Sequence, residues 1–194
     1  MFKMMNGGSS IEGDVKETPD TTVEQAQQQA KRNKFLKIMS TIESSSGKNT
    51  QHRTLSSGIH KGERAIGQYG LMPNTIDEMH TRMKLDGQED PRIKELYEQN
   101  LTPQERADRI SSDPELEGVI ANKLYDHVNE RFQGDEEKMD HAWQYGHNIN
   151  PTKLTPKVLQ KSDRVKKYQL IKDSLDNPKP PVVKPTTFNP GPIS

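Results

Sequence analysis

Apolar side chains are confined to the middle of this chain, and this distribution limits what the chain can fold into. Only 29% of the 194 residues are hydrophobic, and the 13 glycines still leave the apolar share below the roughly 45–50% of a typical globular domain. Large apolar residues are scarce in residues 1–20 and 173–194. We therefore predict a single folded domain over residues 21–150, preceded by an N-terminal arm or tether over residues 1–20.

The spacing of the apolar residues predicts a mainly α-helical domain. Helices are expected over residues 23–40, 73–84 and 114–132, and a last core helix should carry Met139 and Tyr145. The segment 44–70 holds five glycines among Ser, Asn, Thr and Lys, a composition typical of turns or a short irregular sheet. The expected fold class is therefore mainly α, with a small Gly-rich loop or β-hairpin lobe and extended tails on both sides.

Three of the expected helix starts carry a capping signal. In such a signal a Ser, Thr or Asp side chain accepts a hydrogen bond from an unpaired N–H of the first turn. The three are Thr21 followed by Glu24, Thr102 followed by Pro103 and Glu105, and Ser112 or Asp113 followed by Pro114.

Charge and composition exclude several classes of function. The chain carries 28 basic and 28 acidic side chains, so no overall field draws it to nucleic acid. It has no cysteine, which excludes disulfides and thiolate chemistry. The N-terminus lacks the apolar core of a signal peptide, and no stretch is long and apolar enough to span a membrane.

Glu43 is the candidate catalytic residue. It follows the apolar helical stretch 35–42 and precedes a Ser/Gly-rich loop, so one side of its carboxyl group can be desolvated while the other admits a substrate. A glycosidase needs such a proton donor at the glycosidic oxygen. The alternative is a solvated glutamate that simply ends a helix.

Three motifs resemble those of the soluble lytic transglycosylase family of the lysozyme-like superfamily. The first is Ile42-Glu43-Ser44-Ser45, which is followed by Gly47 and Asn49. The second is the stretch 65–75, which reads AIGQYGLMPNT, and the third is the stretch 142–148, which reads AWQYGHN. The order and spacing of these motifs agree with the family over roughly residues 34–148, which implies a lysozyme-like helical domain.

The resemblance implies a role for each matching residue. Glu43 would be the single acid and base, which protonates the leaving oxygen and then takes the proton of the muramoyl 6-hydroxyl, giving a 1,6-anhydro product. Ser44 matches the serine next to the family's catalytic glutamate. Tyr145 matches the family tyrosine that reaches the catalytic carboxylate, with an ordinary core aromatic as the alternative. The backbone of Gly70, Leu71 and Met72 would line the sugar groove, where a missing Cβ lets a polysaccharide approach closely.

The chain also departs from the family pattern. The family's Gln after Gly-Leu-Met has no clear match, so either Gln68 replaces it in a shifted register or Gly70 occupies its place. The family's Tyr-Asn pair is altered to Tyr145-Gly146. A second carboxylate in the Gly-rich lobe would permit ordinary hydrolysis, and Glu63 is the candidate, with a solvated hairpin tip as the alternative.

No metal or cofactor is predicted. His52 and His60 are eight residues apart without matching acidic partners, and residues 86–90 lack the alternation of a calcium loop. The Gly-rich region lacks the Gly-Lys-Ser/Thr ending of a phosphate-binding loop.

The C-terminal part suits partner binding. Residues 151–176 are predicted to form a basic amphipathic helix that docks on a partner protein, and DNA contact through residues 153–172 is the less favoured alternative. Residues 177–194 form a proline-rich tail.

These features together predict a peptidoglycan-cleaving protein without its own export signal. We expect it in the tail or internal core of a phage particle, bound to other virion proteins through its two tails. There it would open the wall locally, in the bacterial periplasm, during genome entry. The alternatives are a virion structural or adaptor protein with an inactive lysozyme-like domain and, third, a DNA-binding protein.

Overall fold

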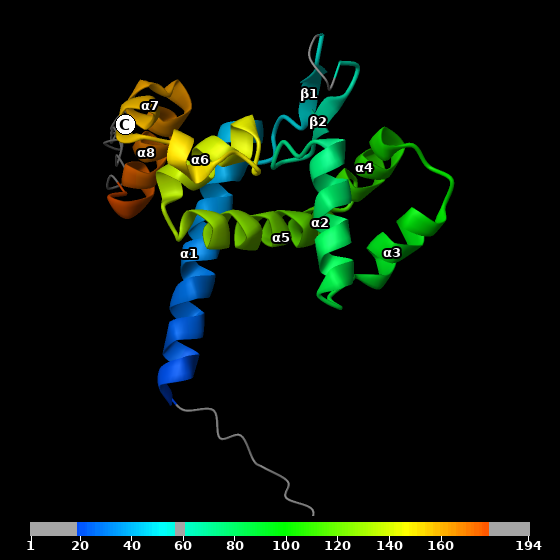
Figure 1. Ribbon diagram of the computed structural model, residues 1–194, viewed down its shortest axis with the longest axis horizontal. Helices are drawn as coiled ribbons and strands as arrows, with labels where there is room; N and C mark the ends of the chain where they lie inside the picture. The colour runs from blue at the N-terminus through cyan, green and yellow to red at the C-terminus, as the bar shows by residue number, and fades with distance from the viewer. Residues whose placement is uncertain (1–18, 57–60, 179–194) are drawn as a thin grey trace, which may run out of the picture.

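The described part of the computed structural model, residues 19–56 and 61–178, is mainly helical, as predicted (Figure 1). The predicted arm before residue 19 and the tail after residue 178 lie outside the described residues. In chain order the elements are α1 (Pro19–Ser44), β1 (Gln51–Thr54), β2 (Arg64–Ile66), α2 (Pro73–Leu85), α3 (Pro91–Glu98), α4 (Pro103–Ser111), α5 (Pro114–Phe132), α6 (Glu136–Tyr145), a short 3-10 turn (Pro151–Lys153), α7 (Pro156–Lys161) and α8 (Asp163–Asp176).

Local capping signals predicted two of the three helix starts correctly. Thr102 accepts from the Glu105 N–H, and Glu105 reaches back to the Thr102 backbone, so α4 begins with a complete capping box. Asp113, rather than Ser112, caps α5. The third prediction is wrong, because α1 begins at Pro19 and Thr21 therefore lies inside the helix.

The predicted hairpin lobe consists of two short strands. β1 and β2 pair antiparallel, with Gln51 opposite Ile66 and Thr54 opposite Arg64. Ile66 also exchanges backbone hydrogen bonds of 2.9 and 3.0 Å with Leu71, which turns the chain back towards α2.

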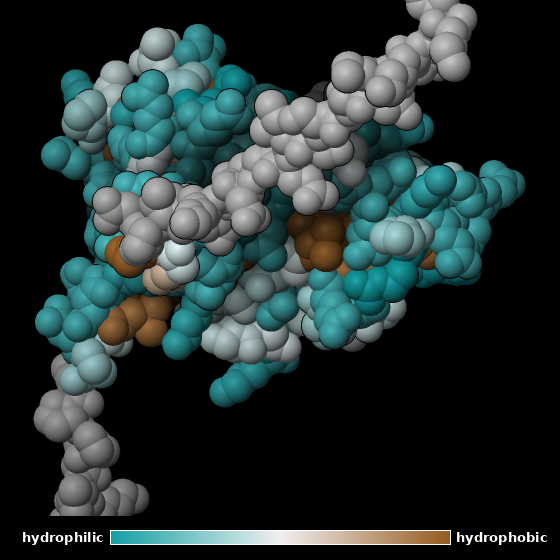
Figure 2. All heavy atoms as spheres, turned by 90° about the horizontal axis from the view of Figure 1, so that it is seen from below, coloured by the Kyte–Doolittle hydropathy of each residue, from teal (hydrophilic) through white to brown (hydrophobic). Residues whose placement is uncertain are grey.

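Helix α5 is the central element of the fold. It contacts α1, α2, α4 and α6, while its residues Ile120 and Val128 are fully buried (Figure 1). The first turns of α1 are exposed and extend away from this body. On the face seen in Figure 2, hydrophilic residues cover most of the surface and apolar groups show only as small separate patches.

The hydrophobic core continues beyond the predicted domain end at residue 150. Leu154, Leu159, Val165 and Tyr168 are all buried in the same cluster as the residues of α1 and α6. The Tyr168 ring lies 5.8 Å from that of Phe35, measured between centroids. The segment 151–176 therefore packs on its own domain, as a 3-10 turn and two helices instead of one amphipathic helix.

None of the described helices combines the length and the apolar character needed to cross a bilayer.

We predict that α8 contributes to the cooperative stability of the domain. Tyr168→Ala removes a side chain that is 0% exposed, so the free energy of unfolding should fall by about 3–5 kcal/mol. Leu170→Ala, on the same helix at 71% exposure, should change it by less than about 0.5 kcal/mol. Urea unfolding of the full chain measures both, and equal small effects would show that α8 lies outside the cooperative unit.

Candidate active site

Glu43 lies in the last turn of α1 and on the wall of a groove of about 570 Å³. Its side chain is 19% exposed, so the carboxylate is largely withdrawn from water yet reachable from the groove. The helical turns before it are anchored by Ile38 and Met39, both fully buried. The groove is lined by α2 and α6, by the residues just before α2 and just after α6, and by residues of α1, α5 and the hairpin lobe: Glu43, Leu55, Ala65, Gly70, Leu71, Met72, Asn74, Thr75, Glu78, Leu124, Trp143, Gln144, Tyr145, Gly146, His147 and Asn148.

Gly70 gives the Glu43 carboxylate its room. A Cβ atom on Gly70 would lie 2.8 Å from Oε2 and 3.0 Å from Cδ of Glu43, which is too close for any other residue without a shift of the carboxylate. Gly70 also has a φ of +63°, which favours glycine. The predicted reason for this glycine was approach by a polysaccharide, whereas in the structure its missing Cβ makes space for Glu43.

The segment from Gly67 to Gly70, which we call the glycine loop, is tied to α1 and β1. The Ser44 hydroxyl is buried, lies 2.9 Å from the carbonyl oxygens of Ser40 and Gln68, and accepts from the Gly47 N–H at 2.8 Å. His52 Nε2 lies 2.8 Å from the Gly67 carbonyl oxygen. Ser44 thus fixes the backbone beside the catalytic candidate and does not face the groove.

Two further side chains hold the same loop from α5 and α6. Glu117 accepts from the Tyr69 N–H at 3.0 Å, and a Cβ on Gly67 would lie 2.2 Å from its Oε1. Burial raises the pKa of Glu117 above its usual value, although hydrogen bonds from the backbone of Tyr69 and Gln68 partly offset this. Trp143 Nε1 donates to the Tyr69 carbonyl oxygen at 3.1 Å. The loop is therefore fixed by contacts from four elements.

Arg164 connects Glu43 to a second carboxylate. Its Nη1 donates to Glu43 Oε1, and its Nε donates to Asp140 Oδ1 at 2.7 Å. Asp140 is 0% exposed and Arg164 is 8% exposed. We call Glu43, Arg164 and Asp140 the charge triad, which joins the end of α1, the middle of α6 and the start of α8.

Asp140 can hold a proton near neutral pH. Burial raises the pKa of Asp140 to about 6, even though the Arg164 guanidinium acts in the opposite direction. The three groups have a net charge of −1 when both carboxylates are ionised and of zero when Asp140 is protonated. Below about pH 6 the charge triad therefore binds one proton next to the groove.

The other predicted site residues occupy mixed positions. Gly70, Leu71, Met72 and Tyr145 line the groove, although Leu71 is 2% exposed and belongs mainly to the core. Tyr145 is 58% exposed, and its ring packs 4.4 Å from that of His141. Its predicted contact with the catalytic carboxylate is not observed, since the described partner of Glu43 is Arg164.

Two predicted residues lie away from the groove. Gln68 points to the opposite side of the glycine loop, where Ser40 Oγ lies 3.4 Å from its Oε1. Glu63 lies in the turn before β2 and is not among the residues that line the groove.

The sequence did not indicate Arg164 and Asp140 as partners of Glu43 in the charge triad. It also did not indicate that Glu117 and Trp143 hold the glycine loop. The groove wall also contains Glu78 and His147, which together with His127 form a cluster able to hold a metal ion.

Comparisons with protein-family models, with curated proteins and with solved structures find no match to this chain.

We predict that Asp140→Asn removes a pH-dependent contribution to folding. Because the pKa of Asp140 rises from its usual 3.8 to about 6 on folding, its contribution to stability is full below pH 4 and is lost as the pH rises through 6. The free energy of unfolding of the unmodified protein, relative to the variant, should therefore fall between pH 4 and pH 7 by up to about 3 kcal/mol. Urea unfolding of both proteins across this range measures the difference, and a constant difference would contradict the assignment.

Proposed function

We propose that this protein cleaves the glycan strands of peptidoglycan as a lytic transglycosylase, with Glu43 as the acid and base. The observation that carries the proposal is the position of Glu43. Its carboxylate is largely buried, faces a groove of a size that suits small ligands or chain segments, and lies against the glycine loop. A lysozyme-like domain remains part of the proposal and rests on the sequence motifs.

The groove offers the kinds of groups that bind sugars. Trp143 and Tyr145 supply aromatic surface, while Asn74, Gln144 and Asn148 supply amide donors and acceptors. Hydroxyl groups of a glycan pair with such amides, and the faces of sugar rings pack on aromatic side chains. These features support a polysaccharide as the substrate.

Within the charge triad, Glu43 alone carries the proton of the proposed reaction. In the reaction, Glu43 gives a proton to the glycosidic oxygen as the bond to C1 breaks, the muramoyl O6 attacks C1, and the O6 proton returns to Glu43. Arg164 stabilises the carboxylate form that exists between these two transfers, and Asp140 carries a proton nearby below about pH 6. No water is consumed, and the acid is regenerated.

The ion pair with Arg164 also favours a second candidate function. The Oε1 atom of Glu43 accepts from the buried Arg164 guanidinium, so in the structure this oxygen is occupied by an ion pair and is not directed at a substrate. The alternative is therefore a structural or adaptor protein of a phage particle in which this domain has lost activity.

Delivery in a phage particle is also part of the proposal. Its support comes from the arm and tail of the sequence, which lie mostly outside the described residues. Helix α8 packs on α1 and α6, so a protein partner of residues 151–176 can bind only to the surface that this packing leaves exposed. That surface includes an apolar hollow lined by Val165 and Leu170.

We predict that Glu43→Gln keeps the fold and removes the activity. The amide preserves the shape of the side chain but cannot transfer the proton, so turnover should fall by about 10²–10⁴-fold. Mass spectrometry of purified peptidoglycan after incubation measures the release of 1,6-anhydro-muropeptides. Reducing-end products would indicate hydrolysis instead.

Glu63→Gln is the matched control, because it makes the same change in a residue that does not line the groove. It should keep the activity of the unmodified protein. If the unmodified protein releases no product, the structural alternative stands, and if a well-folded Glu43→Gln protein is fully active, Glu43 is not the acid.

A further inference from the structure

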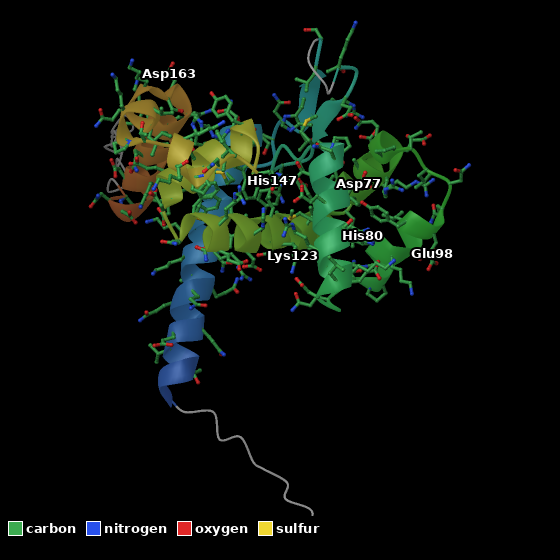
Figure 3. The ribbon with its side chains drawn as sticks, viewed as in Figure 1. Asp77, His80, Glu98, Lys123, His147 and Asp163 are labelled. Carbon is green, nitrogen blue, oxygen red and sulfur yellow. The ribbon has the colours of Figure 1, made fainter. Side chains whose placement is uncertain are left out.

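Glu78, His127 and His147 bring three metal-ligating atoms together at the edge of the groove, where Glu78 and His147 line the groove itself and His127 lines a neighbouring hollow. They come from α2, from α5 and from the loop after α6, and Figure 3 shows His147 in the space between α6 and α2. Their ligand atoms all lie within 4.8 Å of one another. Since the three residues are widely separated in sequence, only the fold creates this cluster.

The unsatisfied nitrogen of His127 is the second observation that points to a ligand. His127 Nε2 is buried and has no hydrogen-bond partner in the described part of the chain. Buried polar atoms are normally paired, so an orphan nitrogen next to a carboxylate and a second imidazole needs a partner. His127 lines a neighbouring hollow, and its ligand atom lies within 4.8 Å of those of Glu78 and His147, which line the groove.

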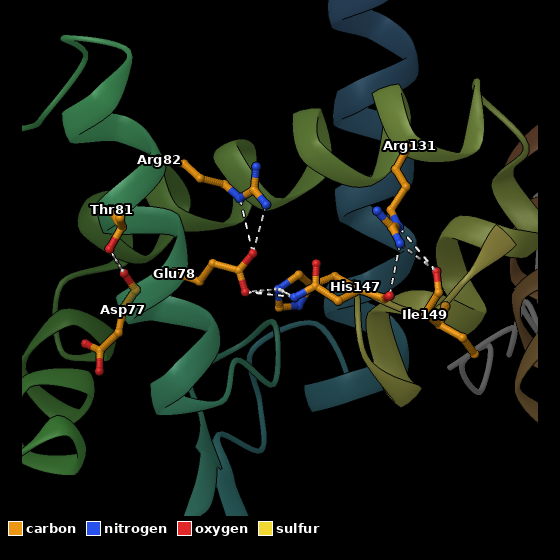
Figure 4. Close-up of polar contacts among 8 residues, drawn as sticks. Asp77, Glu78, Thr81, Arg82, Arg131, His147 and Ile149 are labelled. Carbon is orange, nitrogen blue, oxygen red and sulfur yellow. Dashed lines mark hydrogen bonds and ion pairs between the residues drawn. The ribbon is translucent and has the colours of Figure 1, made fainter.

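The other two groups are already oriented. His147 is 7% exposed, and its Nε2 donates to Glu78 Oε2 at 2.7 Å (Figure 4). Asn148 Nδ2 donates to the same oxygen at 2.9 Å. Burial alone would raise the pKa of Glu78, but hydrogen bonds from His147 and Arg82 outweigh it and lower the value to about 2, so Glu78 is ionised.

From this geometry we propose that Glu78, His127 and His147 bind a divalent transition-metal ion, with zinc as the best match. Two imidazoles and one carboxylate are a recurrent zinc ligand set, and the fourth position would open into the groove. Around a tetrahedral zinc ion the ligand atoms lie about 3.3–3.5 Å apart, as follows from metal–ligand distances of about 2.0–2.2 Å. Binding therefore requires shifts of about 1 Å, with zinc replacing the proton on His147 Nε2.

The positively charged guanidinium groups of Arg82 and Arg131 lie near the proposed metal site, and each is already paired with oxygen atoms. Arg82 donates to Glu78 Oε1, the oxygen that faces away from His147, at 3.0 and 3.2 Å. Arg131 donates to the carbonyl oxygens of Asn148 and Ile149 and so fixes the loop that bears His147 (Figure 4). Both arginines thus act as groups that orient the ligands.

The role of the ion would be to hold the loop after α6 against α2 and α5. This loop forms one wall of the groove, so metal binding would fix the shape of that wall. The inference stands apart from the proposed function, because it requires neither Glu43 nor a glycan.

Zinc binding to the full chain tests the proposal. After treatment with a chelator and dialysis, the protein is titrated with zinc chloride by calorimetry, and the metal content is measured by mass spectrometry. We expect saturation at one zinc ion per chain and a melting temperature that rises with zinc concentration. Cobalt, used in place of zinc, should give the visible absorption bands of a four- or five-coordinate site.

Variants separate this site from adventitious binding. His127→Gln and His147→Gln should each weaken zinc binding by more than about 100-fold, because loss of a direct ligand exceeds the 10–100-fold effect of an outer-shell change. His141→Gln makes the same change outside the cluster and should keep the affinity. Circular dichroism without metal confirms that each variant folds. Absent zinc binding, or equal binding by all the variants, would overturn the proposal.

Discussion

The guanidinium of Arg164 lies between two carboxylates at the point where α1, α6 and α8 meet. Burying a charge is costly unless it is paired, and both Arg164 and Asp140 are almost inaccessible to water. Each member of the charge triad therefore requires the other two: without Asp140 the guanidinium loses its buried partner, and without Arg164 two carboxylates face each other. Because Arg164 belongs to α8, the C-terminal helices must pack on the domain for Glu43 to have its ion-pair partner. A segment that the composition assigned to partner binding thus completes the candidate site.

The glycine loop extends this constraint to the other side of Glu43. Its backbone is held by Ser44, His52, Glu117 and Trp143, and each of these contacts requires a different element to be in place. Gly67 and Gly70 allow the loop to pass directly against Glu117 and Glu43, where a Cβ would collide with either carboxylate. The position of the Glu43 carboxylate is consequently set by packing on one side and by an ion pair on the other, a degree of fixation that a catalytic acid requires.

The features that could be predicted from sequence are those that depend on neighbours in the chain. The capping box at Thr102, the helix over residues 114–132 and the place of Glu43 at the end of a helix all follow from patterns within a few residues. Arg164 and Glu43 are separated by 121 positions, and nothing in the local sequence indicates their contact. The helix α3 was also missed, although Asp90 before Pro91 is a start signal of the same kind as Asp113 before Pro114. The predicted contact between Tyr145 and Glu43 is not observed, because a local motif cannot say which face of α6 is buried. Ala142 lies on the buried face, and Trp143 reaches the glycine loop.

The chemistry of the groove depends on how many of its carboxylates can act as a base. Glu78 is the second carboxylate on the groove wall, and its pKa of about 2 makes it a weak base at neutral pH. Its oxygens are already occupied by Arg82, His147 and Asn148, and a bound metal ion would engage it further. A hydrolase that inverts or retains configuration needs a second carboxylate to activate water or to attack the sugar, and Glu78 is poorly suited to either task. Among the described residues that line the groove, this leaves Glu43 as the carboxylate with an oxygen, Oε2, that lies beside a glycine, which supports chemistry that uses a single acid and base and an internal nucleophile.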